Sequence, residues 1–201
     1  APPTMERIMA ECYEDVRPDH LARYEAAKHW LVSNGKTGHV LDAGCGVGYG
    51  AALLSEVAKR VTAVDASAEA EALHKKHFSR DNVNYVCADL FEASLATSYD
   101  AIVSFEFLEH IHEAEEAVRL YGTLSRILIC STPNEIVRPH KQKPVNPHHV
   151  RHYTPNEFEN LLGTGGYQVK GKFSQRSGQD PQLRPGWDGK FMIAVAVKQK
   201  A

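Results

Sequence analysis

The sequence has no apolar run near the length of a membrane-spanning helix. Its longest uninterrupted apolar stretches, such as residues 127–130 and 191–197, are far shorter than the ~20 residues that cross a bilayer. Residues 1–10 show no basic patch followed by an apolar stretch, so we expect no signal peptide. The four cysteines form no Cys-x-x-Cys pair, which favours reduced thiols. These absences predict a cytoplasmic protein that does not enter a membrane.

The sequence also lacks an overall excess of positive charge. It has 23 Lys and Arg against 25 Asp and Glu, and a formal net charge of −2. A surface built throughout for nucleic acid would need a basic balance, so this function class is disfavoured. The average hides an asymmetry, because residues 138–190 hold nine Lys or Arg and only four Asp or Glu. This segment is either a basic face for a substrate or a solvated loop.

Internal repeats and low-complexity tracts are absent as well. The 201 residues, of which 43% are apolar and 24% charged, have the composition of one globular domain. A chain of this length buries roughly 70% of the surface that its unfolded form exposes, so it can form a full core without disulfides. The sequence therefore predicts a single domain over residues 1–201.

Short apolar runs alternate with amphipathic stretches along most of the chain. Two predicted helices, residues 5–16 and 19–32, come first. The strand and helix pairs that follow are 39–41 with 51–58, 61–64 with 68–77, 83–87 with 91–96, 101–104 with 106–121, and 127–130 with 154–162. Such alternation predicts a doubly wound α/β domain, in which helices cover both faces of a mostly parallel sheet. Residues 167–173 and 191–197 predict an antiparallel pair of strands at one edge of that sheet.

A glycine-rich turn follows the first predicted strand directly. Gly44, Gly46, Gly48 and Gly50 alternate with other residues, and a predicted helix begins close behind them. Glycine allows the backbone to approach a ligand closely, and free N–H groups at the start of a helix suit a nucleotide-like ligand. Asp42, at the end of the strand, would repel a pyrophosphate but attract an ammonium group. S-adenosylmethionine carries an ammonium group and no phosphate.

The acids at the next strand ends extend this pattern. The turn of residues 42–48, with Asp65 ending the second strand and Asp89 following the third, resembles the class I S-adenosylmethionine-dependent methyltransferases, whose fold is Rossmann-like. The resemblance implies that Asp65 binds the two ribose hydroxyls and Asp89 the adenine amino group. It also implies that the turn, with Gly44 and Gly46, passes beneath the methionyl part of the cofactor. Residues 1–36 would then be N-terminal helices, 37–130 the cofactor-binding core and 131–201 the substrate side.

Three apolar or aromatic residues complete the predicted cofactor site. Leu90 and Phe105 would form walls for the adenine and the methionyl chain, and Tyr49, beside the glycines, would close over the methionyl end. A structural alternative remains open for the acids, because an aspartate after a strand is often a turn or helix-capping residue. Their joint placement at consecutive strand ends favours cofactor binding.

Two carboxylates and an imidazole follow the fourth predicted strand. The spacing of Glu106, Glu109 and His110 would place all three on one face of a helix that points to the carboxyl end of the sheet. Like charges so close raise each other's pKa unless a cation or a donor lies among them, so the cluster indicates a metal ion or a substrate hydroxyl network. The alternative is a solvated helix start, where the helix dipole favours acids.

The longest irregular stretch, residues 131–153, adds histidines near the same end of the sheet. Its Ser-Thr-Pro-Asn string at 131–134 and its Asn-Pro-x-His-x-Arg string at 146–151 resemble a methyltransferase branch met in bacterial sugar and cell-surface polysaccharide clusters. That resemblance gives His149 the position of interest and Arg151 the basic one. Loops of this length in a compact domain usually have a functional role.

The Glu-x-x-Glu-His string also resembles two other methyltransferase groups. These are the quinone-ring O-methyltransferases and the small-RNA 3′-end 2′-O-methyltransferases, in which two Glu and two His hold a divalent ion. The resemblance makes Glu106, Glu109, His110 and His149 candidate ligands, a mixed oxygen and nitrogen set that suits Mg, Mn or Zn. The chain departs from the family at residues 118–126, where the usual Gly-Gly turn is missing.

The sequence therefore predicts an S-adenosylmethionine-dependent methyltransferase that transfers the methyl group to a hydroxyl of a small-molecule or glycan acceptor. His149 or His110 would act as the base, or a divalent ion held by the cluster would lower the pKa of the hydroxyl. An anionic acceptor would meet the basic segment. Two other hypotheses stay open: a divalent-metal-dependent RNA 3′-end 2′-O-methyltransferase, and a non-catalytic S-adenosylmethionine-binding subunit.

Overall fold

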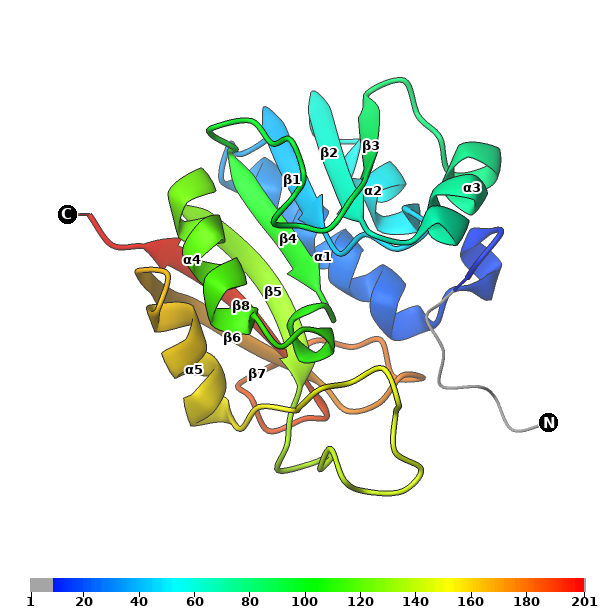
Figure 1. The fold of residues 1–201 in the computed structure, drawn as a ribbon. Coiled ribbons are helices and arrows are strands. Elements are labelled where there is room, and N and C mark those ends of the chain that lie inside the picture. The colour runs from blue at the N-terminus through cyan, green and yellow to red at the C-terminus, as the bar shows by residue number, and fades with distance from the viewer. Residues whose placement is uncertain (1–8, 201) are drawn as a thin grey trace.

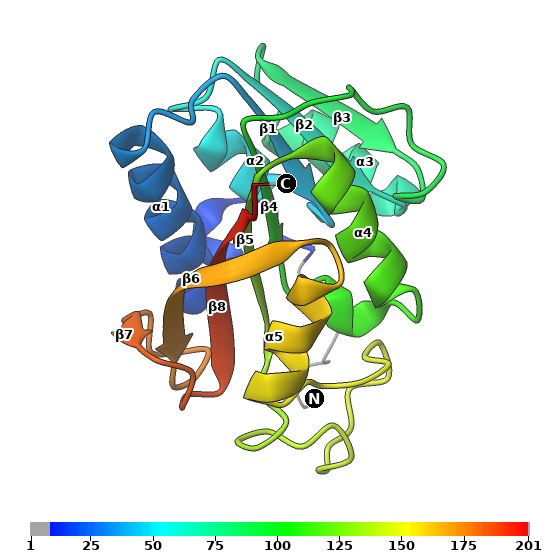
Figure 2. The same cartoon turned by 90° about the vertical axis from the view of Figure 1, so that its left-hand side faces the viewer.

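The computed structural model describes residues 9–200, which build one eight-stranded sheet with helices on both faces (Figures 1 and 2). The strands are β1 (His39–Ala43), β2 (Arg60–Asp65), β3 (Val83–Cys87), β4 (Ala101–Phe105), β5 (Ile127–Pro133), β6 (Tyr167–Gln175), β7 (Arg184–Pro185) and β8 (Phe191–Lys198). The helices are α1 (Pro18–Ser33), α2 (Tyr49–Leu54), α3 (Ala68–His77), α4 (Ala114–Leu124) and α5 (Pro155–Gly163), with short 3₁₀ turns η1 (Tyr13–Asp15) and η2 (Leu108–His110).

The order of the strands confirms the predicted doubly wound fold. It is β3-β2-β1-β4-β5-β8-β6-β7, with β1 to β5 parallel and β8 antiparallel to both β5 and β6. The chain moves outward from β1 to β3, then returns to build β4 and β5 on the other side. Ligands of open α/β sheets bind at such a reversal, beyond the carboxyl ends of the strands. The reversal here lies between β1 and β4.

The two faces of the sheet carry separate apolar cores. Helices α1, α2 and α3 cover one face, where Leu31 and Leu54 are fully buried, and α4 and α5 cover the other, around Val118 and Phe158 (Figure 2). Strands β1, β4 and β5 are buried nearly end to end, as parallel strands covered on both faces must be. No helix in residues 9–200 is long and apolar enough to cross a membrane.

Two of the predicted helices are wrong. The helix predicted at 5–16 lies partly outside the described residues, and its described part holds only η1. Pro18 begins α1 and restricts Arg17 to an extended backbone, so a preceding helix cannot continue into it. Residues 91–96 form turns instead of a helix, and Phe91 is 43% exposed. A helix this short needs an apolar face packed on the core, and here only Ala93 and Leu95 are partly buried against it.

The helix predicted at 106–121 is broken into two parts. Glu106 has a φ of 50°, η2 follows it, and α4 begins only at Ala114. The backbone N–H of Glu106 is bound by the Ser131 side chain on β5, which fixes this non-helical turn at the end of β4. Glu106, Glu109 and His110 therefore do not share one face of a helix.

Candidate functional site

The glycine turn lies at the carboxyl end of β1 and is fastened to β2. Asp65 accepts hydrogen bonds from the backbone N–H of Gly46 at 3.0 Å and of Ser67 at 2.9 Å. Gly46 has a φ of 56°, and a Cβ at this residue would meet no atom within 4 Å. The left-handed conformation explains the glycine. The empty space beside it means that the backbone itself faces an open cavity.

This cavity, about 640 Å³ in volume, extends along the carboxyl ends of the strands. One end, which we call the turn end, is lined by Gly44, Gly46, Tyr49, Asp65 and Phe105. The other end, the loop end, is lined by Glu106, His110, Arg138, His149 and Lys190. The structure thus brings most of the predicted site residues together in one cavity.

Asp42 is placed differently from the rest of the predicted cofactor site. Its side chain is fully buried and does not line the cavity; the Tyr24 hydroxyl donates to its two oxygens at 3.1 and 3.3 Å. Burial raises the pKa of Asp42 to about 7, the Tyr24 hydrogen bond opposes this rise, and the charge of Asp65 adds to it. Tyr24 lines the cavity and packs edge-on against Phe105, so Asp42 acts on the cavity through Tyr24.

Asp89 and Leu90 lie outside the residues that line the cavity. Asp89 is exposed, and its carboxylate accepts the backbone N–H of Phe91 at 2.9 Å, as in an aspartate turn. Leu90 is buried in the core on the α4 side of the sheet, with Leu41 and Val64. The structure therefore shows the turn-capping geometry for Asp89, and neither residue contacts the glycine turn.

The two glutamates after β4 have different surroundings. Glu106 lines the cavity, and its carboxylate accepts the Ser131 hydroxyl at 2.9 Å. Glu109 is fully buried, accepts the Thr132 hydroxyl at 3.2 Å, and has its Oε1 3.6 Å from Nε2 of His110. Burial raises the pKa of both carboxyls, and Glu106 raises that of Glu109 further. Both groups therefore favour the protonated form more than an exposed glutamate does.

A chain of imidazoles occupies the loop end of the cavity. Asn146 donates to Nε2 of His149 at 3.2 Å, Nδ1 of His149 lies 2.7 Å from Nε2 of His152, and Nδ1 of His152 donates to the Arg138 carbonyl at 2.6 Å. These partners define the neutral Nδ1–H form of both rings. Burial, and after it the charges of the neighbouring imidazoles, His110 first, together lower the pKa of His149 to about 3. The ring of His110 packs edge-on against that of His149, with 4.6 Å between the two ring centroids.

The predicted metal ligands do not form a metal site in this structure. Within residues 9–200, no three His, Cys, Asp or Glu side chains are grouped closely enough to hold a metal ion. Glu109 turns to Thr132 and His110, whereas His149 turns to Asn146 and His152. Because the helix after β4 is broken, these side chains do not lie on one helical face as the sequence predicted.

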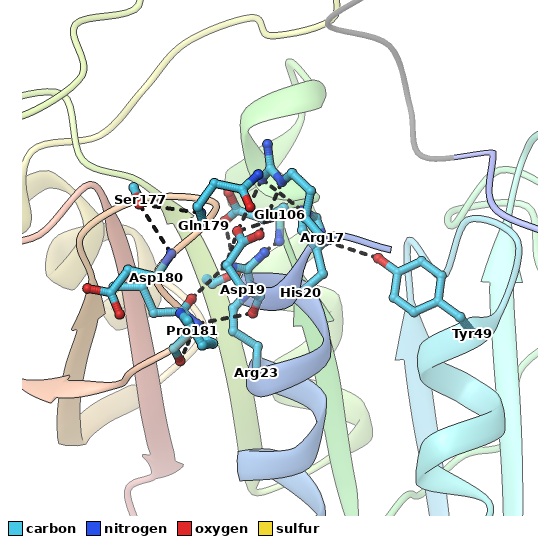
Figure 3. A network of polar contacts seen from close by, with 12 residues as sticks. Arg17, Asp19, His20, Arg23, Tyr49, Glu106, Ser177, Gln179, Asp180 and Pro181 are labelled. Atoms are coloured by element: carbon cyan, nitrogen blue, oxygen red, sulfur yellow. Dashed lines mark hydrogen bonds and ion pairs between the residues drawn. The ribbon is translucent and has the colours of Figure 1, made fainter. Parts of the chain in front are cut away.

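A charged network that the sequence analysis missed borders the cavity (Figure 3). Arg17 donates twice to Asp19 at 3.1 Å, and the buried Arg23 donates to Asp19 at 3.1 Å. Arg17 also donates to His20 at 3.0 Å, and His20 in turn contacts the Tyr49 hydroxyl at 3.0 Å. The carboxylate of Asp19 thus pairs with two guanidinium groups, those of Arg17 and Arg23. The pairs of Asp19 lie at the start of α1, and the contact of His20 with Tyr49 joins this helix to α2; no motif marks the network.

The basic residues that line the loop end do not include Arg151, which the sequence predicted there. Arg151 pairs with Glu157 at 2.7 Å, packs over Tyr153, and does not line the cavity. Arg138 and Lys190 line it instead. They stand at the two ends of the basic segment 138–190, so the charge asymmetry of the sequence was the signal that could have found them.

The fold and the cavity define a class of protein, and comparison with known proteins agrees. A family profile described as "Methyltransferase domain" matches residues 17–170. The chain therefore belongs to this family of methyltransferase domains. A relative from Mycobacterium tuberculosis, named "Probable S-adenosylmethionine-dependent methyltransferase", is 36% identical over 168 residues, covering 78% of this chain and 61% of the relative. The chain thus spans about three fifths of the length of this curated relative.

Solved structures share the fold. N-methyltransferase NodS from Bradyrhizobium japonicum, in complex with S-adenosyl-L-homocysteine, has a TM-score of 0.72 and 17% identity, over 98% of this chain and 97% of that one. Magnesium protoporphyrin IX methyltransferase from Synechocystis, with bound S-adenosylhomocysteine, has a TM-score of 0.70 and 21% identity, over 90% and 84% of the two chains. At these identities the likeness concerns the fold.

Proposed function

We propose that this chain is an S-adenosylmethionine-dependent methyltransferase that methylates a hydroxyl of a small-molecule or glycan acceptor. The observation that carries the proposal is one continuous cavity, with the glycine turn and Asp65 at one end and imidazoles at the other. Membership of a methyltransferase family, and structural neighbours with bound S-adenosylhomocysteine, support the choice of cofactor. In this proposal, residues 37–130 supply the turn end, where the cofactor binds, and residues 131–201 supply most of the loop end, where the acceptor binds.

The turn end fits the adenosyl cofactor. The open space beside Gly46 admits a ligand against the backbone, and Asp65 presents a carboxylate at the cavity wall. Each Asp65 oxygen accepts one backbone N–H, and a carboxylate, with about four lone-pair sites, is a group that can accept the hydroxyls of a ribose. Tyr49 and Phe105 add aromatic walls. When bound, the cofactor would supply a methyl group on a positively charged sulfur.

His149 is the residue to which we assign the acceptor hydroxyl. Its Nε2 is a hydrogen-bond acceptor, since Asn146 donates to it and Nδ1 faces His152. An acceptor hydroxyl that replaced Asn146 would donate to the same nitrogen. His110 is less suited, because its Nδ1 donates to the His148 carbonyl at 2.8 Å and its Nε2 faces Glu109. Methyl transfer asks mainly for positioning of the two reactants and removal of one proton.

The cofactor part is tested by calorimetry with S-adenosylhomocysteine. We expect the wild-type chain to bind, Asp65→Ala to bind at least tenfold more weakly through loss of charge-assisted hydrogen bonds to ribose, and the exposed Asp81→Ala to bind like the wild type. Absence of binding by the wild type would contradict the proposal.

The transfer part is tested with isotope-labelled S-adenosylmethionine and a native extract, followed by mass spectrometry. The expected result is a labelled O-methyl product that is lost in His149→Ala but retained in His148→Ala, whose exposed side chain is next in sequence. Turnover retained in His149→Ala would remove the assigned role. Cofactor binding without turnover on any fraction would favour the non-catalytic subunit.

The RNA 3′-end alternative depended on a metal held by the Glu and His cluster, and within residues 9–200 no group of three such side chains could hold a metal ion, so the alternative has no structural support. It predicts labelled RNA, and loss of transfer on addition of chelator. Transfer unaffected by chelator would exclude it.

A further inference from the structure

Two cations at the loop end of the cavity lack an acidic partner. Among the described residues, no carboxylate lies within ion-pair distance of Lys190 or Arg138. The Lys190 ammonium lies 5.2 Å from the centre of the Phe191 ring. The Arg138 guanidinium donates only to backbone carbonyl oxygens of residues 139–144. The positive charges of Lys190 and Arg138 are therefore available to a ligand that enters the cavity.

Asn134 fixes the two cation-bearing segments to each other. Its backbone N–H donates to the Lys190 carbonyl at 2.8 Å, and its own carbonyl accepts the N–H of Arg138 at 2.8 Å. Its side-chain amide, which is buried, donates to the carbonyls of Trp187 and Gly189 at 3.1 and 3.2 Å. Segments some fifty residues apart are thus joined by one residue, so the fold itself brings Lys190 and Arg138 to the same cavity.

A further cation lies near Lys190 and Arg138. Arg17 also lines the cavity, and it shares the single carboxylate of Asp19 with Arg23. Partial burial lowers the pKa of Lys190, and the charges of Arg17 and Arg138 lower it further, while Asp19 and Glu106 oppose this. An anion between the cations would relieve the repulsion.

We propose that Lys190 and Arg138 bind an oxyanion, a phosphate or a carboxylate, carried by the methyl acceptor. This proposal rests on the proposed function and specifies its substrate class: an acidic molecule whose hydroxyl reaches His149 while its anionic group meets these cations. Lys190 supplies a point charge and Arg138 a planar guanidinium, and both groups bind phosphates and carboxylates in proteins. The competing occupant is the carboxylate of the cofactor's own methionyl part.

The test titrates anions into the protein saturated with S-adenosylhomocysteine, at constant ionic strength, and follows backbone amide signals by NMR. The probes are inorganic phosphate in one arm and acetate in the other, so the arm that saturates identifies the anionic group. We compare the wild type with Lys190→Met, Lys190→Arg and the exposed control Lys76→Met. Affinity of each variant for S-adenosylhomocysteine is measured separately by calorimetry.

We expect saturable shifts in the wild type for one or both anions and at least tenfold weaker anion binding in Lys190→Met, the range for loss of a charged hydrogen-bond partner. Lys190→Arg, which retains the charge, and Lys76→Met should stay close to the wild type. Equal anion binding in Lys190→Met and wild type overturns the proposal, as does an absence of saturable shifts. A parallel loss of cofactor affinity in Lys190→Met also overturns it, because the cation then serves the methionyl carboxylate. In the calorimetry, failure of the wild type to bind the cofactor would instead count against the proposed function.

Discussion

The buried carboxyl of Asp42 makes the stability of this protein depend on pH in a defined way. Its pKa is raised from 3.8 to about 7, chiefly by burial. Between these values the folded protein holds a proton that the unfolded chain releases. The folded state binds more protons there, so the contribution of Asp42 to stability falls as pH rises from about 4 to about 7. A rise of three pKa units corresponds to at most about 4 kcal/mol.

Asp42→Asn removes this ionisation and keeps an oxygen for the Tyr24 hydroxyl. We expect the difference in free energy of unfolding, variant minus wild type, to rise between pH 4 and pH 8 by up to about 4 kcal/mol in favour of the variant. Any cost of the amide N–H₂ group is the same at each pH and cancels in this change.

The assay is urea denaturation at unit steps of pH, followed by circular dichroism. Asp81→Asn, at an exposed position, is the control and should show no such slope. Contributions of other titrating groups appear in both proteins and largely cancel in the difference. A difference that stays constant from pH 4 to pH 8 would refute the reasoning, because it would mean that Asp42 ionises in the folded protein as readily as in the unfolded chain.

Two further substitutions test the turn and the charged network. Gly46→Ala should cost about 1–2 kcal/mol in urea denaturation, because φ is 56°, and should weaken S-adenosylhomocysteine binding by placing a methyl group in the cavity. Gly163→Ala, with open space and no positive φ, should do neither. Asp19→Asn should cost about 3–5 kcal/mol, because it leaves Arg23 buried and charged without its carboxylate. Asp180→Asn, which breaks a pair whose side chains are 32% and 28% exposed, should cost much less, and equal effects of the two would contradict the argument.

The strands were predictable because parallel strands covered on both faces are continuous apolar runs, and β1, β4 and β5 are of this kind. Helix predictions were wrong where a tertiary contact determines the backbone. The Ser131 side chain on β5 binds the N–H of Glu106, and residues 106–121 lose their helical start. A spacing of three or four residues carries no information about that contact.

Within the site, the predictable part is local in sequence. The glycines and Asp65 lie at consecutive strand ends, and parallel topology alone brings them together. Arg138 and Lys190 are brought to one cavity by the pairing of β5 with β8, where Pro133 lies opposite Phe191, and by the hydrogen bonds of Asn134, which no periodicity reveals. The burial of Asp42 was not predictable from the sequence either, because its contact with Tyr24 depends on how α1 packs. The sequence therefore predicted the contact between the glycine turn and Asp65 better than the arrangement of the cations.

The two ends of the cavity differ in the sign of their charge, and this difference orders the proposed ligands. Asp65 lies at the turn end, whereas the loop end has the two cations Arg138 and Lys190 and one carboxyl, that of Glu106, which follows the turn-end residue Phe105 in sequence. A cofactor with ammonium and sulfonium charges is favoured beside the carboxyls, and an acidic acceptor beside the cations. If the cofactor and the acceptor exchanged places, like charges would lie close together at both ends of the cavity. In the proposed function, electrostatics would therefore direct the methyl donor toward the glycine turn and the acceptor hydroxyl toward His149, before any specific contact is made.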